Sequence, residues 1–89
     1  MIKLRAVERK NDYRLLLRCS DGTAGVCGFA PFVEAATEMT APLADPAFFA
    51  QHFIEFVALA WPNGFDLSAE SLRQRLQSAG KLRRDAEAA

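Results

Sequence analysis

The sequence holds few of the residues from which metal sites and catalytic centres are usually built. Among its 89 residues are one histidine and two cysteines. Cys19 and Cys27 lack the paired spacing of a zinc site and are too few for a disulfide framework, so we expect two buried thiols. His52 has no partner at ligand or catalytic spacing, and we expect it to lie partly exposed near a helix end. The sequence therefore predicts no catalytic residue, no metal and no cofactor.

Other absences exclude further classes of protein. No apolar run reaches the roughly 18 to 20 residues that span a bilayer, and the charged start MIKLRAVERK lacks the apolar stretch of a signal peptide. The glycines of DGTAGVCG have neither the lysine nor the helix start that a phosphate-binding loop uses. No serine lies in a nucleophile motif. We expect a cytoplasmic protein that is not an enzyme and has no small-molecule substrate.

Apolar residues, in contrast, are abundant: they make up 51% of the chain and include seven phenylalanines. This is enough to build the core of one domain, which we place at residues 1–80, with residues 81–89 as a charged, frayed tail. The aromatic stretch in the second half exceeds what one small core readily buries. It predicts a surface for a protein partner or a second copy of the chain, formed by Phe48, Phe53, Ile54 and Phe56.

The charges are segregated along the chain, although they sum to zero. Residues 1–18 carry a net charge of +4, residues 19–70 contain seven acids and no Lys or Arg, and residues 71–89 carry +3. The basic ends offer candidate nucleic-acid contacts, which are Lys3, Arg5, Arg14, Arg18, Arg73, Arg83 and Arg84. The alternative is a solvated sheet face whose charges are balanced by the acidic middle of the chain.

Three stretches near the N-terminus have the pattern of β-strands. IKLRAVE (2–8) and YRLLLRC (13–19) alternate in polarity, and AGVCGFA (24–30) follows the turn signal SDGT. Ile2, Leu4 and Ala6 should face one way in the first strand. In the second, Leu16 should lie on the mostly polar face, opposite the face of Tyr13, Leu15, Leu17 and Cys19. These patterns predict a three-strand antiparallel meander.

The middle of the chain is less uniform. The stretch between Pro31 and Pro42 fits either a loop or a short helical turn. Asp45 can cap a helix whose first residue is Pro46, which predicts a short helix to about Gln51. Residues 52–61 fit either a continuation of that helix or a strand. We favour a strand over roughly residues 55–61, because the PNG that follows is typical of a strand connection.

The stretch WPNGFDL (61–67) has the chemistry of a hairpin turn. Pro at the second position, Asn at the third and Gly at the fourth suit a type I turn that closes into a bulged hairpin. Asp66 is expected to accept backbone N–H bonds at the junction with the next helix; a carboxylate that binds a substrate beside Trp61 is the alternative. LSAESLRQRLQSAG (67–80) then predicts an amphipathic helix capped by Ser68 and ended by Gly80.

At this point the sequence resembles the family known as domain of unknown function 2442. The residues that carry the resemblance are Val7, the strand residues Tyr13, Leu15, Leu17 and Cys19, the turn Asp21-Gly22, APL (41–43), DP (45–46), Phe49, the string WPNGFDL and Leu72. The most specific part is that string, namely Trp61, Pro62, Asn63, Gly64, Asp66 and Leu67. The resemblance implies a compact bacterial α+β domain with no assigned activity. Some members are followed by a helix-turn-helix segment, and others resemble antitoxin partners of small toxins. The chain departs from the pattern at Gly28, where an acidic residue often stands, and over residues 53–57.

Together these patterns predict an α+β fold: an N-terminal three-strand antiparallel meander, a short helix, a second hairpin through WPNG and a C-terminal amphipathic helix. The function we expect is that of a non-catalytic bacterial interaction module, for example an antitoxin-like partner of a small toxin, which also forms homodimers. The alternative is a nucleic-acid-associated regulator that uses the basic sheet face and the C-terminal arginines.

Overall fold

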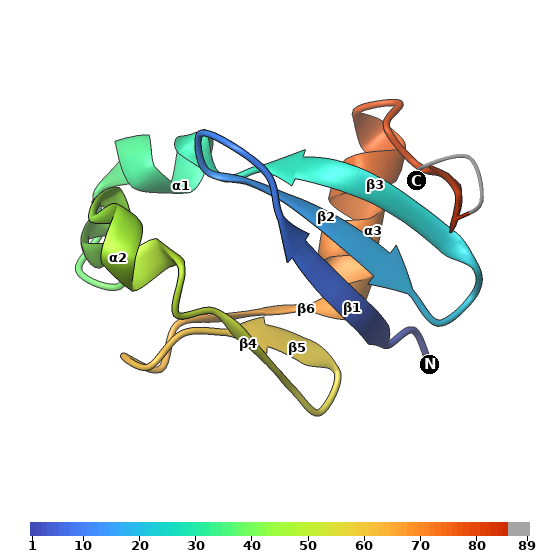
Figure 1. Cartoon of the computed structure of the whole chain (residues 1–89), viewed down its shortest axis with the longest axis horizontal. Helices are drawn as coiled ribbons and strands as arrows, with labels where there is room; N and C mark the ends of the chain where they lie inside the picture. The colour runs from blue at the N-terminus through green and yellow to red at the C-terminus, as the bar shows by residue number, and fades with distance from the viewer. Residues whose placement is uncertain (86–89) are drawn as a thin grey trace.

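The computed structural model describes residues 1–85, which form two antiparallel sheets joined by short helices (Figure 1). The larger sheet has the order β1-β2-β3-β7 and the smaller one the order β4-β5-β6. Helix α3 crosses one face of the larger sheet, and α1 and α2 lie together at one end of the molecule (Figure 1). The predicted α+β fold is confirmed, with its meander, short helix, second sheet and C-terminal helix in the expected order.

The meander consists of β1 (Leu4–Arg9), β2 (Arg14–Cys19) and β3 (Thr23–Gly28). These strands pair in sequence order, and Leu15 stands opposite Cys27 in the centre of the core face. Asp21 accepts a hydrogen bond from the Thr23 N–H at 3.1 Å, which closes the turn that the Asp-Gly pair predicts.

Strand β1 contains a bulge that reverses its alternation. The register with β2 shifts between Leu4 and Ala6, so Ala6 pairs with Arg18 and the next residue, Val7, pairs with Leu17. The expectation that Ala6 shares the face of Leu4 is therefore wrong, because the bulge places an extra residue between them. Leu16 lies on the opposite face as expected, but it is fully buried rather than solvated.

The stretch after β3 forms three short helical elements. They are α1 (Ala30–Ala35), the 3-10 helix η1 (Ala41–Ala44) and α2 (Pro46–Phe49). The stretch between Pro31 and Pro42, for which the sequence fits either a loop or a short helical turn, thus has a helical element at each end. Asp45 caps α2 as predicted, since its carboxylate accepts from the Ala47 N–H at 3.0 Å. The helix ends at Phe49, slightly before the expected limit.

Residues 52–61 do not continue the helix, but neither do they form one strand. Strands β4 (Phe53–Glu55) and β5 (Ala58–Ala60) pair as a tight hairpin in which Glu55 is opposite Ala58. The single strand predicted over residues 55–61 is therefore wrong in its first half. The chain reverses because Phe56 adopts a left-handed backbone with φ of 56°. This conformation usually belongs to Gly or Asn, so composition gave no signal for it.

The second hairpin passes through WPNG as predicted and joins β5 to β6 (Asp66–Ser68). Helix α3 (Ala69–Ser78) follows directly, and the Ser68 hydroxyl accepts from the Ser71 N–H at 3.1 Å. Gly80 ends the helix with φ of +71°. Leu72 and Leu76 are buried, which confirms the predicted core face of the helix.

Residues 81–85 return to the larger sheet. Strand β7 (Arg83–Arg84) pairs with the start of β3, and the Asp85 N–H donates to the Gly22 carbonyl at 2.7 Å. The sequence predicted a frayed tail here; these residues are instead paired with β3, whose edge offers unpaired backbone groups to the returning chain. The rest of the predicted tail, residues 86–89, lies outside the described residues.

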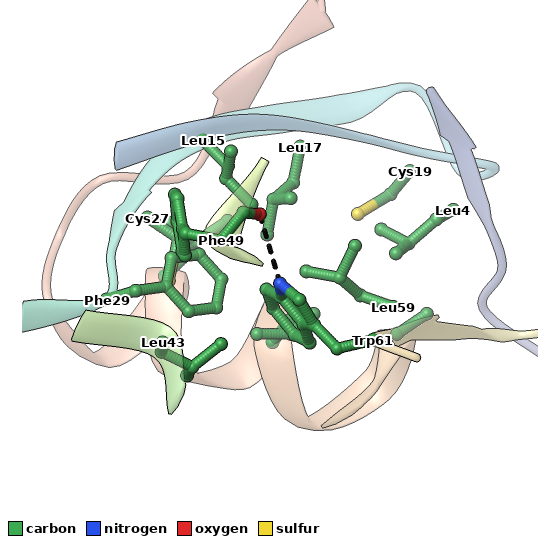
Figure 2. Close-up of a cluster of buried hydrophobic side chains, with 13 residues drawn as sticks. Leu4, Leu15, Leu17, Cys19, Cys27, Phe29, Leu43, Phe49, Leu59 and Trp61 are labelled. Atoms are coloured by element: carbon green, nitrogen blue, oxygen red, sulfur yellow. Dashed lines mark hydrogen bonds between the residues drawn. The ribbon is translucent and has the colours of Figure 1, made fainter. Parts of the chain in front are cut away.

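The core lies where both sheets, α2 and α3 meet. Its centre is an aromatic cluster of Phe29, Phe49 and Trp61, with ring centroids 5.7 to 5.9 Å apart. Figure 2 shows leucines from β1, β2 and β5 around this cluster. Both cysteines are free and buried, as predicted. The tryptophan of the WPNG string thus belongs to the core and not to an open surface.

Candidate functional site

The WPNGFDL string holds the smaller sheet to the rest of the fold. Trp61 is 1% exposed, and its indole N–H donates to the Phe49 carbonyl at 3.0 Å, the dashed line in Figure 2. The Gly64 N–H donates to the Trp61 carbonyl at 3.0 Å, as a type I turn requires. The amide of Asn63 reaches the Met39 carbonyl, also at 3.0 Å. These bonds make Trp61, Pro62, Asn63 and Gly64 structural residues.

Asp66 does not play the part expected of it. Its carboxylate accepts no hydrogen bond from the described part of the chain, and the cap of α3 is supplied by Ser68 instead. The alternative of a substrate-binding carboxylate beside an aromatic wall also fails, since Trp61 is buried and presents no open face. Asp66 is an exposed acid on β6, followed by the half-buried Leu67.

The basic sheet face is largely neutralised by carboxylates. Asp85 forms ion pairs with both Arg5 and Arg18, and Arg18 also reaches Glu8 at 2.7 Å. These hydrogen-bonded carboxylates, Glu8 first, raise the pKa of Arg18. Because guanidinium groups that contact carboxylates have fewer free donors, this face offers little to a phosphate backbone.

The remaining candidate nucleic-acid contacts lie near the turn between β2 and β3, apart from Arg14. Arg73 on α3 pairs with Asp21 at 2.8 Å, and Arg14 donates to the Asn11 side chain at 2.5 Å. Arg83 donates to the Gly80 carbonyl at 3.1 Å. Arg84 is exposed on β7, and Lys3 is exposed just before β1, where its backbone bonds to Ser20. Six of the seven residues thus lie near the turn between β2 and β3, with Arg14 at the far end of β2, and three of the six pair with carboxylates.

The β4–β5 hairpin presents the exposed apolar surface. Phe53 is 41% exposed, Ile54 37% and Phe56, at the turn, 90%. Phe48, the fourth residue predicted for this surface, is half-buried and packs against the core instead. His52 precedes the hairpin, where its ring Nδ1 lies 3.2 Å from the Phe49 carbonyl; it is half-buried near the end of α2, as expected.

Sequence reasoning missed two features of these surfaces. One is the tight turn that lifts Phe56 into solvent, and the other is the carboxylate of Asp85, which lies 80 residues from Arg5 in the chain. Within residues 1–85, no three His, Cys, Asp or Glu side chains are placed to hold a metal ion. In the same part of the chain, every helix is too short or too polar for a membrane span.

One comparison with known proteins gives a match. The model of a family described as protein of unknown function (DUF2442) matches residues 4–78. No curated protein and no solved structure matches the chain. The matched range runs from the start of β1 to the end of α3 and includes the WPNGFDL string, the residues on which the resemblance was based.

Proposed function

Because the chain belongs to the DUF2442 family, whose function is unknown, its role has to be inferred from its own surface, and we propose that it is a protein-interaction module. In this proposal the β4–β5 hairpin receives an extended segment of a partner protein along the outer edge of β4. The module itself is non-catalytic. An antitoxin-like role, with a small basic toxin as the partner, is one form of this function.

The observation that carries the proposal is the state of Phe56. It combines two unfavourable features, an aromatic ring that is 90% exposed and a left-handed backbone with φ of 56°. A left-handed conformation costs a residue with a Cβ about 1–2 kcal/mol, and an exposed ring contributes no burial energy. Neither feature stabilises the isolated fold. Strain and apolar exposure at one residue are typical of a contact point.

The strand beside Phe56 is suited to receive a partner strand. All three residues of β4 are exposed, and within residues 1–85 no strand pairs with its outer edge. Ile54 lies opposite Leu59, and Leu59 lies opposite Leu67, so one apolar row crosses the sheet and reaches that edge. An added strand with an apolar residue beside Ile54 would extend this row and bury it.

Charge indicates the chemistry of the partner. The segment from residue 19 to residue 70 contains no Lys or Arg, and Glu55 and Asp66 are exposed on the smaller sheet. A basic partner segment would therefore be attracted, whereas a second copy of the same acidic edge would be repelled. We infer a partner with an apolar residue for Ile54 and a Lys or Arg near Glu55. The expected homodimer then becomes an alternative outcome.

The test compares capture by matched baits. The wild type, Phe56→Asn and Ala36→Gly are immobilised and exposed to a lysate of the source cell. Phe56→Asn removes the ring and eases the backbone strain. Ala36, another non-glycine residue with a left-handed backbone (φ 48°), lies at the end of α1, so Ala36→Gly eases strain without changing the hairpin. We expect a basic protein that the wild type and Ala36→Gly retain and that Phe56→Asn loses at least about ten-fold, as for a central interface anchor.

Two results would contradict the proposal. One is capture of the same proteins in equal amounts by all three baits. The other is a concentration-dependent dimer in sedimentation that Phe56→Asn abolishes, with no basic protein captured. That second result would keep the hairpin as the binding surface but would make its occupant a second copy of the chain.

A further inference from the structure

A cleft between β3 and α3 lies apart from the β4–β5 hairpin and contains no residue of the smaller sheet. Its volume is about 260 Å³. The walls are mainly apolar and include Val26, Pro31 and Leu76, and two basic residues, Arg75 and Lys81, line it as well. Small-molecule sites usually combine apolar walls with a few polar groups in this way, at volumes from about 300 Å³ upward. The volume of this cleft is just below that range, so it suits a ligand about the size of one ring with a small polar group.

Two glycines of β3 show where the neighbouring chain approaches this strand closely and where it does not. A Cβ on Gly25 would lie 2.6 Å from the Lys81 carbonyl oxygen and 3.2 Å from the Leu76 methyl groups, so the chain after α3 is pressed against β3 there. A Cβ on Gly28, three residues further on, would meet no described atom within 4 Å. Gly28 lines the cleft at the part of the β3 edge that β7 leaves unpaired, since β7 pairs only with Thr23 and Ala24.

Three arginines of the fold are occupied by ion pairs, and the two cations at the cleft are not. Arg5, Arg18 and Arg73 each pair with a carboxylate. Among residues 1–85, neither Arg75 nor Lys81 forms such a pair.

The guanidinium of Arg75 lies 4.6 Å from the centre of the Phe32 ring, and this cation–π contact restrains it beside the cleft. An arginine held in this way keeps its N–H donors available for a carboxylate. Both cations also lie close enough to the Cys27 thiol, which lines the cleft, to act on its charge. Burial is nevertheless the larger influence and raises the pKa of Cys27, so the thiol stays neutral. The cleft therefore has positive charge that a ligand can neutralise.

We propose that this cleft binds a small amphipathic carboxylate. The carboxylate group contacts Arg75 and Lys81, and the apolar body lies against Pro31 and Leu76. A neutral molecule of the same shape would gain the apolar contacts but not the charge-assisted hydrogen bonds, so it binds more weakly.

Sodium benzoate is a suitable probe, because it joins one carboxylate to one flat apolar ring. Amide shifts of the ¹⁵N-labelled protein are followed as benzoate is added, with benzamide as the neutral comparison. We expect saturable shifts centred on residues 26–28 and 75–81, with a Kd on the order of 1 mM for so small a ligand. Benzamide, Arg75→Gln and Lys81→Gln should each weaken binding at least about five-fold.

Ala79→Leu provides the steric test, since Ala79 lines the cleft and is exposed at the C-terminal cap of α3, where a larger side chain should take up part of the space. We expect this variant to fold and to lose benzoate binding. Arg73→Gln is the matched control: it removes a cation from the same helix but does not line the cleft, and its binding should match the wild type.

The proposal is overturned if the shifts do not saturate, if benzamide binds as well as benzoate, or if Ala79→Leu still binds as the wild type does. Any of these results would identify benzoate as an adventitious additive only. Should Ala79→Leu not fold, unchanged binding by the double variant Arg75→Gln/Lys81→Gln would overturn the proposal, and loss of binding there would support it. Neither variant alters the β4–β5 hairpin, so this test is independent of the interaction module.

Discussion

The two sheets of the protein treat their exposed edges differently. In the larger sheet the strands β1 to β3 are six residues long, and the chain returns at β7 to pair with β3. In the smaller sheet each strand has three residues, and the edge strand β4 is exposed at every position. A protein usually covers or shortens its strand edges because an open edge invites pairing with another chain. Here β7 covers the β3 edge of the larger sheet, where β1 remains an edge strand, and no strand covers β4 in the smaller sheet within residues 1–85.

The charges follow the same division. On the larger sheet Arg5 and Arg18 have carboxylate partners in Glu8 and Asp85. On the smaller sheet Glu55 and Asp66 face solvent, and no Lys or Arg occurs in the sequence between residues 19 and 70. The larger sheet thus pairs Arg5 and Arg18 within the chain, whereas the smaller sheet exposes both apolar surface and negative charge. Under the proposed function, this exposed surface is the part that receives a partner.

The strongest way to break this division is to detach the smaller sheet from the core. Trp61→Ala removes a fully buried indole and its hydrogen bond to the Phe49 carbonyl. We expect a loss of about 3–5 kcal/mol in the free energy of unfolding, as for other large-to-small core changes. Urea denaturation followed by circular dichroism measures it. Phe56→Ala is the control. It also removes an aromatic ring, but an exposed one, so the free energy of unfolding should not fall. A loss below about 1 kcal/mol for Trp61→Ala would show that the string is not the main anchor.

The next prediction concerns the edge that the larger sheet covers. Gly25→Ala places a Cβ 2.6 Å from the Lys81 carbonyl oxygen, so the chain that leads to β7 must move. We expect a cost of about 1–3 kcal/mol, typical of overpacking, and faster hydrogen exchange at the Asp85 amide.

Gly28→Ala serves as the matched substitution for this test. It lies on the same strand, but its new Cβ meets no described atom within 4 Å. Because Ala has less backbone freedom to lose than Gly, this variant should be neutral or slightly stabilising. Equal losses at the two positions would mean that the close approach of Lys81 is not what requires glycine at position 25.

A smaller effect of opposite sign is expected at the open edge. Phe56→Asn should stabilise the isolated protein by about 1 kcal/mol, because Asn tolerates the left-handed backbone that Phe56 is forced to adopt. Thermal unfolding would show a rise in Tm. Ala36→Gly should give a similar rise without affecting partner capture. A fall in Tm for Phe56→Asn would show that the exposed ring stabilises the hairpin itself.

The sequence predicted those parts of the fold in which local chemistry decides the structure. Alternating polarity and the Asp21-Gly22 pair predicted the meander. Asp45 and Ser68 predicted the starts of two helices, and the Pro-Asn-Gly of the WPNG string predicted the second hairpin. In each case the residues that form the turn or cap are neighbours in sequence, so their types alone are sufficient to identify it.

The features that the sequence did not reveal depend on distant contacts or on strain. The turn at Phe56 has no residue that favours a positive φ, and the bulge in β1 has no glycine to mark it. The ion pair from Arg5 to Asp85 joins residues 80 apart. Composition identified the surplus of apolar residues between Phe48 and Phe56, but only packing could show that Phe48 is covered and Phe56 is not.

The smallest predicted effect tests whether ion pairs stabilise the larger sheet side of the molecule. Asp21 accepts hydrogen bonds from the Thr23 hydroxyl at 2.5 Å and from Arg73 of α3 at 2.8 Å. The bond from the Thr23 hydroxyl is the main cause that lowers the pKa of the Asp21 carboxyl in the folded protein, with a further contribution from Arg73. The folded state therefore favours the ionised carboxylate. Its stabilising effect is complete above the unfolded pKa of about 3.9 and is lost as the pH falls through the lower folded value.

Asp21→Asn should accordingly be less stable than the wild type at pH 7, by about 0.5 kcal/mol for a partly exposed surface pair. The two proteins should converge as the pH falls well below 4. Urea denaturation at pH 7 and at pH 2.5, each at low and high salt, separates the contributions, because salt weakens the pair with Arg73 more than the bonds from Thr23. Asp66→Asn, at an acid without a partner within residues 1–85, should show no such convergence. If Asp66→Asn showed the same convergence, general charge repulsion would account for the pH dependence. Paired charges on the larger sheet would then contribute no more to stability than the unpaired acids of the smaller sheet.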